Sequence, residues 1–400
     1  MTSPTLTTVS LRAGHLVRQQ SGPEGYSAFI PNPLPPDPPV DFRGELRDFL
    51  EEASYALGRL EGVSTSLHPD RLLYMYIRKE AVLSSQIEGM QSTLSDLLQY
   101  ENVEAPGVPI DDIREVSSYV NALQYGFQRL NEGMPLTLRL IREIHAVLMQ
   151  SGGRGAHQTP GEFRRTQNWI GGTRPSNARF VPPPPHELLR TIGELEHFIH
   201  DIDYRTSPIV KAGLVHVQFE TIHPFLDGNG RLGRLLITFL LCAQGALSQP
   251  CLYLSLYFKE HRTDYYDALQ RVRSHGDWEG WMRYYLIGVA HTATQATRTT
   301  QALLALFATD RDQVLQLGRS VASALRVYEY IQQRVIVSIP RASETLQLSV
   351  PTVTAALGRL VGLGIAREIT GKAYARQYVY QCQLDLLNQG GDERHILPAQ

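Results

Sequence analysis

Cysteine is scarce in this chain of 400 residues, which contains three, Cys242, Cys251 and Cys382. They are far apart in the sequence and have neither the paired spacing of a zinc site nor the density of a disulfide framework. We therefore expect no disulfide scaffold and no cysteine-bound zinc. Free thiols suit a reducing compartment, so we expect the protein to be cytoplasmic.

Long apolar runs and a strong net charge are also absent. The sequence has no apolar run of about 18 residues and no basic segment followed by an apolar one at its N-terminus, so we expect neither a membrane helix nor a signal peptide. The formal net charge of −2 provides no overall field that favours nucleic acid. A hydrophobic content of 42% is ordinary for a globular protein, and the length allows two or three domains.

A Walker A sequence is absent too, which excludes a P-loop for nucleotide phosphates. The chain has instead the segment 223–234, His-Pro-Phe-Leu-Asp-Gly-Asn-Gly-Arg-Leu-Gly-Arg. Apolar residues recur at helical spacing from 207 to 222 before it, and an apolar run from 235 to 242 follows it. We predict a helix, a tight loop and a second, buried helix.

Glycines and arginines give this loop the features of a phosphate site. Gly228, Asn229 and Gly230 tolerate positive φ, so successive backbone N–H groups can converge on an anion where the second helix begins. The dipole of that helix adds to the attraction. Arg231 and Arg234 share a helical face, and their planar guanidinium groups suit phosphate oxygens. We predict that both arginines hold the charged end of a nucleotide.

A histidine and an aspartate complete the predicted site. His223 is the only side chain of the segment that titrates near neutral pH, so it can accept a hydroxyl proton. Asp227 beside a polyphosphate is a natural ligand for Mg²⁺, because Mg²⁺ binds one or two carboxylates together with phosphate oxygens and water. The segment therefore combines a base, a metal ligand and an anion site.

Other interpretations of the glycines fit less well. A plain turn between two core helices explains Asp-Gly and Asn-Gly but not the neighbouring histidine and arginines. The spacing Gly-x-Gly-x-x-Gly also occurs in dinucleotide-binding loops, which need a preceding strand and an acidic residue about twenty positions later, where this chain has Tyr253. A calcium loop would need Gly and Glu where Leu232 and Thr238 stand.

The segment 223–234 resembles the signature of the Fic family, His-x-Phe-x-Asp/Glu-Gly-Asn-Gly-Arg-x-x-Arg, and matches it at every defined position. Members of this family typically transfer AMP from ATP to a Ser, Thr or Tyr hydroxyl of a protein, on a mostly helical fold. The resemblance implies that His223 is the base for the target hydroxyl and that Asp227 holds Mg²⁺ on the α- and β-phosphates. We expect Phe225 to anchor the loop in the core.

The resemblance also assigns the phosphate-binding residues. Asn229, together with the amides of Gly228 and Gly230, would form an anion hole. Arg231 would contact the region of the β-phosphate and serve the phosphates alone. Arg234 would contact the γ-phosphate.

A second element, Ser84-Ser-Gln-Ile-Glu88-Gly89, resembles the inhibitory pattern Ser/Thr-x-x-x-Glu-Gly/Asn of the same family. Residues 71–83 are apolar at helical spacing, so we predict a helix that ends near Gly89. The resemblance implies that Glu88 pairs with Arg234 and occupies the arginine that the γ-phosphate needs. A solvated helical glutamate is the alternative, because the pattern is short.

Residues 161–172 and 178–181 are short extended runs around a turn rich in Gly, Pro, Ser and Asn, which indicates a hairpin. In Fic proteins a hairpin flap aligns the target segment by strand pairing, and Ile170 would pin the target side chain. A purely structural hairpin is the alternative. A later amphipathic helix carries Tyr265 and Tyr266, one of which the resemblance places beside the adenine, although an aromatic residue on a helix is more often part of the core.

The expected fold class is mainly α: a helical Fic fold with a short β-hairpin flap, followed by a small C-terminal winged-helix domain. Breaks in composition give the expected divisions of the chain. The first is an extended proline-rich leader without a core of its own (1–40), and the second is an N-terminal helical region with the inhibitory helix (41–110). The catalytic domain follows (111–308) and is closed by a long helix from 277 to about 307. The last two are the winged helix-turn-helix domain (309–385) and a flexible tail (386–400).

Predicted helices at 321–333, 340–346 and 350–361, followed by two strands around a turn at 366–380, resemble a winged helix-turn-helix domain. Seven basic residues and three acidic ones lie between 320 and 382, a balance that permits contacts with phosphate groups. Winged helices also bind proteins. Docking of DNA and docking of a protein both stay open, as does a homodimer.

Two classes of function follow. The first is a self-inhibited nucleotidyltransferase, a protein adenylyltransferase that uses ATP and Mg²⁺ to modify a target protein or itself. The second is a transcriptional regulator whose Fic-like domain binds a nucleotide without turnover. The histidine and aspartate favour the enzyme, because a sensor needs an anion site but no base. A Fic enzyme that uses another phosphate-containing donor, or that removes AMP, is a further alternative.

Overall fold

The protein is mainly α-helical, as the sequence predicts. A computed structural model describes residues 12–19, 24–65, 69–102, 110–150, 159–371 and 376–389. The helices are α1 (Glu45–Ser64), α2 (Pro69–Ile87), α3 (Leu94–Tyr100), α4 (Ile110–Asn131), α5 (Leu138–Leu148), α6 (Pro185–His200), α7 (Pro208–Ile222), α8 (Asn229–Ala243), α9 (Ser255–Glu260), α10 (Arg262–His275), α11 (Trp278–Leu315), α12 (Val321–Arg334), α13 (Ile339–Leu346), α14 (Val350–Gly362) and α15 (Gln381–Asn388). The strands are β1 (Gly14–Gln19), β2 (Tyr26–Pro31), β3 (Ile336–Ser338), β4 (Arg367–Glu368) and β5 (Gln377–Val379). In this described part of the chain, no helix has the length and apolar character needed to cross a membrane.

Helix α7 lies at the centre of the helical bundle. Every residue from Ile209 to Ile222 is buried, and α8, which packs against α7, is buried from Leu232 to Leu241. A helix that is buried on all sides needs neighbours on all sides. The connection between these two helices is therefore held in place by the core that surrounds them.

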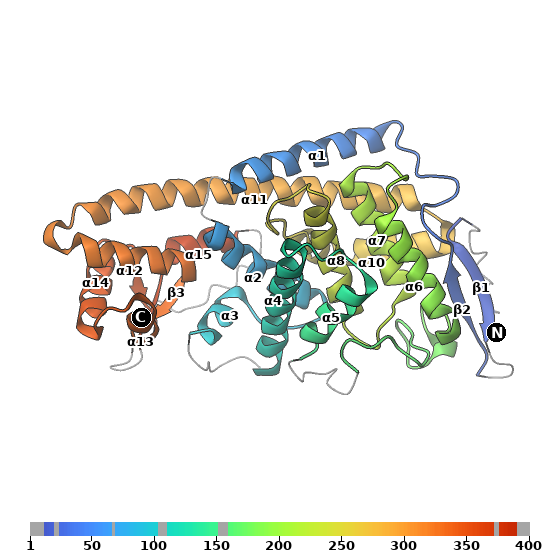
Figure 1. The fold of residues 1–400 in the computed structure, drawn as a ribbon, viewed down its shortest axis with the longest axis horizontal. Coiled ribbons are helices and arrows are strands. Elements are labelled where there is room, and N and C mark those ends of the chain that lie inside the picture. The colour runs from blue at the N-terminus through green and yellow to red at the C-terminus, as the bar shows by residue number, and fades with distance from the viewer. Residues whose placement is uncertain are drawn as a thin grey trace.

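Helix α11 is 38 residues long and extends along the length of the molecule, with α1 beside it (Figure 1). The expected boundary between the catalytic domain and the next domain, at residues 308 and 309, falls inside this helix. Phe307 and Asp310, on either side of it, are both buried. The helix continues because no glycine or proline occurs between 289 and 315.

Residues 12–19 and 24–40 do not form the expected leader without a core. Strands β1 and β2 pair in antiparallel register, Phe29 and Ile30 are buried, and the N–H of Phe29 donates to the carbonyl of Val181 at 2.9 Å. The prolines on which this expectation rests are concentrated at the end of β2 and directly after it. The aromatic and β-branched residues before them can therefore pair and pack as a hairpin.

The C-terminal part has the helices predicted between 321 and 361, each to within one residue, as α12, α13 and α14. The two predicted strands form short segments of a sheet with the order β3-β5-β4. Strand β3 was not predicted, because three residues are too few for a periodic signal. Residues 372–375, in the predicted turn, lie outside the described residues.

Helix α15 shortens the expected flexible tail, which was predicted to begin at residue 386. Leu387 is buried, and the carbonyl of Gln389 accepts hydrogen bonds from Lys79 Nζ at 3.2 Å and from Gln295 Nε2 at 3.1 Å. Residues 386–389 thus belong to the fold. The rest of the predicted tail lies outside the described residues.

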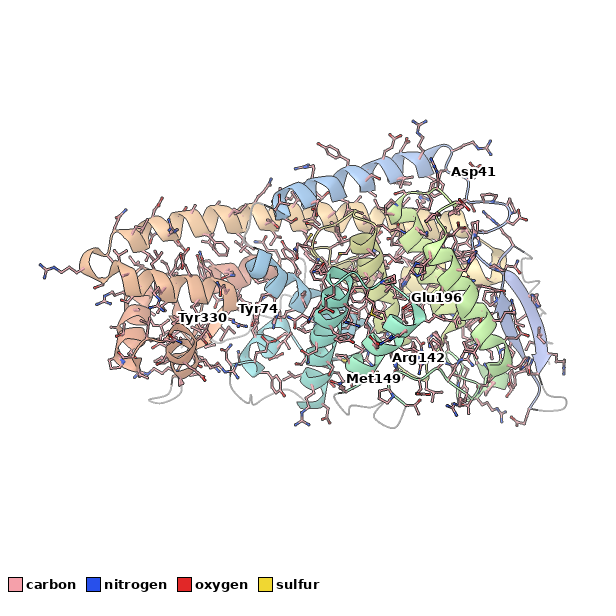
Figure 2. All side chains as sticks on the ribbon, viewed as in Figure 1. Asp41, Tyr74, Arg142, Met149, Glu196 and Tyr330 are labelled. Carbon is pink, nitrogen blue, oxygen red and sulfur yellow. The ribbon has the colours of Figure 1, made fainter. Side chains whose placement is uncertain are left out.

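Helix α2 contacts α4 and α9 and, in the C-terminal part of the chain, α12. Tyr74 on α2 and Tyr330 on α12 line a cavity of about 440 Å³ between them (Figure 2). Gln383 Nε2 on α15 donates to Met75 Sδ on α2 at 2.8 Å. The C-terminal part therefore rests directly on the helix whose far end carries Glu88.

Candidate active site

The loop 223–228 joins α7 to α8, as the sequence predicts. His223 caps α7 in the left-handed conformation, with a φ of 49°, and its N–H donates to the carbonyl of Phe219 at 2.9 Å. Gly228, before the first residue of α8, is also left-handed, with a φ of 76°, a conformation that glycine adopts without a Cβ clash. These two residues turn the chain so that His223 and the start of α8 border one cavity.

Asn229 holds the loop together from within. Its Oδ1 accepts a hydrogen bond from the N–H of Phe225 at 2.9 Å, and its Nδ2 donates to the carbonyl of Phe225 at 2.8 Å. Phe225 is fully buried and stacks on the ring of His145, with 3.7 Å between the centroids. Phe225 thus anchors the loop, and the side chain of Asn229 braces the loop instead of pointing its amide at an anion.

Arg164 and Asn168 brace the loop from outside, and no sequence pattern singles them out. Arg164 Nε donates to the carbonyl of His223 at 2.9 Å. Asn168 Nδ2 donates to the same carbonyl at 3.2 Å and to that of Phe225 at 2.9 Å. Burial lowers the pKa of Arg164 to about 10, so it stays charged at neutral pH and satisfies loop carbonyls that water cannot easily reach.

His223 is neutral in this environment. Burial, reinforced by the charges of Arg273 and Arg164, lowers its pKa to about 3. Its Nδ1 lies 3.3 Å from the carbonyl oxygen of Glu220. In the tautomer that donates to this carbonyl, Nε2 carries the lone pair and can accept a proton from a hydroxyl group.

A cavity of about 450 Å³ brings the predicted nucleotide-site residues together. Asp227 borders it with a side chain that is 41% exposed, and the N–H of Gly228 donates to Asp227 Oδ1 at 2.6 Å. One accessible carboxylate fits a Mg²⁺ ion that also binds phosphate and water. Within the described residues, no group of three or more His, Cys, Asp or Glu side chains is placed to hold a metal by itself. The predicted residues on the cavity wall are Glu88, Ile170, His223, Asp227, Gly228, Asn229, Gly230, Arg231, Arg234 and Tyr265.

Arg231 does not serve the phosphates alone. Its Nη1 donates to Glu115 Oε2 at 3.0 Å, and the two side chains are 5% and 8% exposed. Glu115 lies on α4, 116 positions away in the sequence, and no local pattern points to it. The prediction that Arg231 is reserved for the nucleotide must be corrected, because a buried carboxylate already holds its guanidinium group.

Arg234 pairs with Glu88, as predicted. Arg234 Nη2 donates to Glu88 Oε1 at 2.7 Å and to the carbonyl of Ser84 at 3.0 Å, and Nε donates to Ser84 Oγ at 2.8 Å. Arg234 is 2% exposed, whereas Glu88 is 36% exposed. Helix α2 ends at Ile87, and Gly89 has a φ of 92°. The Glu88 carboxylate therefore stands just beyond the helix end, at the wall of the nucleotide cavity.

Gly230 allows this close approach. A Cβ atom at position 230 would lie 2.5 Å from Glu88 Oε1 and 3.2 Å from Arg234 Nη1. Contacts of this length require a side chain to move. The glycine therefore leaves room for the ion pair at the cavity wall.

The predicted flap is present in reduced form. Ile170 and Phe180 form one antiparallel bridge, with backbone hydrogen bonds of 2.8 and 3.1 Å. Residues 161–168, however, form turns, bends and irregular backbone and no strand. Polar side chains of this stretch bond to the loop 223–228, and no partner strand lies opposite them among the described residues. Ile170 borders the same cavity as His223 and Asp227.

Tyr265 is a core residue that reaches the cavity wall. It is 1% exposed, its hydroxyl lies 2.9 Å from His216 Nε2, and its ring stacks on Phe258 with 4.6 Å between centroids. Tyr266 is partly buried and borders the same cavity. Of the two tyrosines on the cavity wall, Tyr266 is therefore the more exposed.

Comparisons with known protein families match two regions of the chain. Residues 135–241, which include the whole loop and α7, match the Fic/DOC family, and residues 47–128 match the Fic/DOC family N-terminal region. The chain contains a Fic domain. The resemblance inferred from segment 223–234 is confirmed. The N-terminal match includes Glu88 and Glu115.

Curated relatives named protein adenylyltransferase Fic are similar to part of the chain. The protein from Aedes aegypti is 33% identical over 183 residues, which are 44% of this chain and 33% of the relative. The protein from Drosophila grimshawi is 29% identical over 231 residues, 55% of this chain and 44% of the relative. The chain thus matches between a third and half of the length of these relatives.

Solved structures share the fold. A Fic family protein from Desulfovibrio desulfuricans G20 has a TM-score of 0.56 at 19% identity, covering 86% of this chain and 97% of its own. A Fic domain containing signaling protein from Bacteroides thetaiotaomicron has a TM-score of 0.50 at 18% identity, covering 63% and 98%. At these identities the likeness concerns the fold alone.

Proposed function

We propose that this protein is an adenylyltransferase that transfers AMP from ATP to a Ser, Thr or Tyr hydroxyl of a protein, including itself. The observation that carries the proposal is one cavity bordered by a neutral histidine, an accessible aspartate and the glycine-rich start of a helix. The similarity to relatives named protein adenylyltransferase Fic supports it. A nucleotide sensor needs no base, so His223 favours an enzyme.

In the proposed reaction, the target hydroxyl oxygen attacks the α-phosphorus of ATP. The bond from that phosphorus to the oxygen bridging the β-phosphate breaks, and pyrophosphate leaves. His223 Nε2 accepts the hydroxyl proton, while the N–H groups and dipole at the start of α8 stabilise the phosphates. Arg231 contributes its charge from the position in which Glu115 holds it. Asp227 would hold Mg²⁺, which neutralises phosphate charge when it is bound.

We further propose that Glu88 inhibits this reaction by occupying Arg234, which would otherwise hold the γ-phosphate. Helix α2 itself is firmly held, because the buried carboxylate of Glu80 accepts hydrogen bonds from the N–H of Ser255 and the hydroxyl of Tyr119, both at 3.2 Å. Relief of inhibition therefore needs movement of the Glu88 side chain at the helix end, not departure of the helix.

The C-terminal part is proposed to be a docking module of the winged-helix type. Two features support this proposal: the local excess of basic residues and the order of elements, which is α12, β3, α13, α14, β4 and β5. Because α12 and α15 contact α2, a partner bound there, whether DNA or protein, has a physical connection to the helix that precedes Glu88. Gel-shift and pull-down assays on the full chain separate these two partners.

Incubation with labelled ATP and Mg²⁺ tests the proposed activity. We expect the Glu88→Gly protein to label itself, and the same protein with His223→Ala to be slower by about 10²–10⁴-fold, the usual effect of a general base. A suitable control is His291→Ala, since His291 is exposed on α11, and it should leave labelling unchanged. Equal labelling with and without His223 would contradict the mechanism.

A further inference from the structure

A second and larger cavity, of about 590 Å³, adjoins the nucleotide cavity. It lies between the β1–β2 hairpin, the segment 175–181 and the C-terminal end of α10. Arg273 lines both cavities, so the two cavities share part of their walls. Nothing in the proposed reaction uses this space.

The wall of this second cavity is basic. Arg18, Arg179, Arg273 and His275 line it, and no Asp or Glu is among the described residues of its wall. The C-terminal end of α10 adds a partial negative charge of about one half, and Arg179 is paired at 2.6 Å with Asp267, both side chains being about half exposed. Three guanidinium groups outweigh these contributions, so the cavity attracts negative charge.

Arg273 is held in place by neutral groups. Its Nε donates to Thr221 Oγ1 at 3.3 Å, its Nη2 donates to the carbonyl of Glu220 at 2.9 Å, and the guanidinium group lies 4.2 Å from the centre of the Phe180 ring. Burial lowers its pKa to about 10, which still leaves it charged at neutral pH. The nearby buried side chain of Glu220 also interacts with this charge, but the hydrogen-bond partners of Arg273 are neutral groups, so its guanidinium group can still attract an anion to the cavity that it lines.

Polar and apolar groups of the wall provide further contacts. Ser176 Oγ is buried and has no hydrogen-bond partner among the described residues, so it has an unused donor and acceptor at the cavity. Leu16 is 44% exposed and lies two residues from Arg18 on β1, which places the two side chains on the same face of the strand. The wall therefore combines positive charge, an unsatisfied hydroxyl and an apolar surface.

We propose that this cavity docks an acidic segment of the protein whose hydroxyl group is modified, with its carboxylates on Arg18, Arg179 and Arg273. This inference rests on the proposed AMP transfer. The three arginines come from three separate segments of the chain and do not converge from one loop, an arrangement that suits carboxylates spaced along a peptide better than a single phosphate. The docked segment leads to the Ile170–Phe180 bridge, beside which the target hydroxyl would lie.

Fluorescence anisotropy with two labelled peptides tests this docking on the full chain without ATP. One peptide has glutamates around a central threonine, and the other has glutamines at the same positions. We expect the glutamate peptide to bind about tenfold more tightly, and the double variant Arg18→Gln/Arg179→Gln to remove most of that difference. The matched control is Arg298→Gln, which removes an exposed arginine of α11 and should bind both peptides as the parent does.

Several outcomes would overturn the docking proposal. These are equal binding of the two peptides, an unchanged preference in the double variant, and displacement of the glutamate peptide by inorganic phosphate at equal concentration, which would indicate a small-anion site. Self-association of the chain that the double variant abolishes would indicate that the surface binds a second copy. If the peptide binds as expected but the Glu88→Gly protein transfers no label, the proposed activity fails and the basic docking site for an acidic segment stands.

Discussion

Arg231 and Arg234 lie on one face of α8 and each pairs with a glutamate, yet the two pairs differ in their access to water. Glu115, the partner of Arg231, lies within α4 and is 8% exposed, whereas Glu88, the partner of Arg234, stands beyond the end of α2 and is 36% exposed. Breaking an enclosed pair leaves a buried charge uncompensated, but a partly exposed carboxylate can turn into water. We infer that the first pair fixes the site and that the second can open.

The largest expected difference between the two pairs is in stability. Glu115→Ala removes the enclosed carboxylate that holds the buried guanidinium group of Arg231 and leaves it with the exposed Asp227, at 4.0 Å, so we expect a loss of about 3 kcal/mol in the free energy of unfolding. Urea unfolding followed by circular dichroism measures this loss. Glu132→Ala, which removes an exposed partner of Arg129 near the end of the same helix, is the control and should change little. A similar small change for Glu115→Ala would mean that its pair does not fix the site.

A second prediction contrasts Glu80, inside α2, with Glu88 at its end. Burial raises the pKa of Glu80 to about 7 from its usual value near 4.5, so the folded state binds a proton that the unfolded state releases. The stability that the protonated Glu80 side chain contributes is fully present below about pH 4.5 and is lost as the pH rises through 7. Glu80→Gln should match the parent near pH 5 and be more stable by about 1–3 kcal/mol at pH 8.

Thermal unfolding of the parent and of Glu80→Gln across this pH range measures the difference between them. The buried histidines, such as His223, shift in the opposite direction, because their lowered pKa values cost stability as the pH falls. They are present in both proteins, so the difference between the two curves isolates Glu80. A difference that does not change with pH would show that Glu80 is not a buried group whose pKa is raised in the folded state.

The smallest stability effect is expected at Glu88. Because the Glu88 carboxylate is partly exposed and the buried Arg234 keeps its hydrogen bonds to Ser84 after the change, Glu88→Gly should cost only about 1 kcal/mol. The same urea unfolding experiment measures it beside Glu115→Ala. A loss as large as that of the Glu115 variant would contradict the view that this pair is built to open.

The sequence predicts the parts of this site that lie close together in the chain. Residues 223–234 supply the base, the metal ligand and both arginines, and the flanking apolar periods predict α7 and α8, because helices and tight turns are determined locally. The Glu88–Arg234 pair was predicted only through a family resemblance, since the two residues are 146 positions apart. Spacing along the chain contains no information about such a pair.

The remaining parts depend on tertiary contacts. Glu115, Arg164 and Asn168 reach the loop from distant segments, and each belongs to a common residue type without a distinctive neighbourhood. The N-terminal hairpin was missed because the proline-rich run that follows it dominated the composition of residues 1–40. The predicted domain boundary falls inside α11, because nothing local marks where this helix leaves one set of neighbours and joins another.

The most direct test of the difference between the two arginines is the rate of self-labelling by ATP in Glu88→Gln and Glu115→Gln, measured beside the parent at a temperature where all three are folded. Both changes remove one carboxylate charge and keep the side-chain shape. The rate should rise by about tenfold, equivalent to ~1.4 kcal/mol, in Glu88→Gln, and should not rise in Glu115→Gln. An unchanged rate in Glu88→Gln, or an equal rise in both variants, would contradict the assignment of one fixed pair and one that opens.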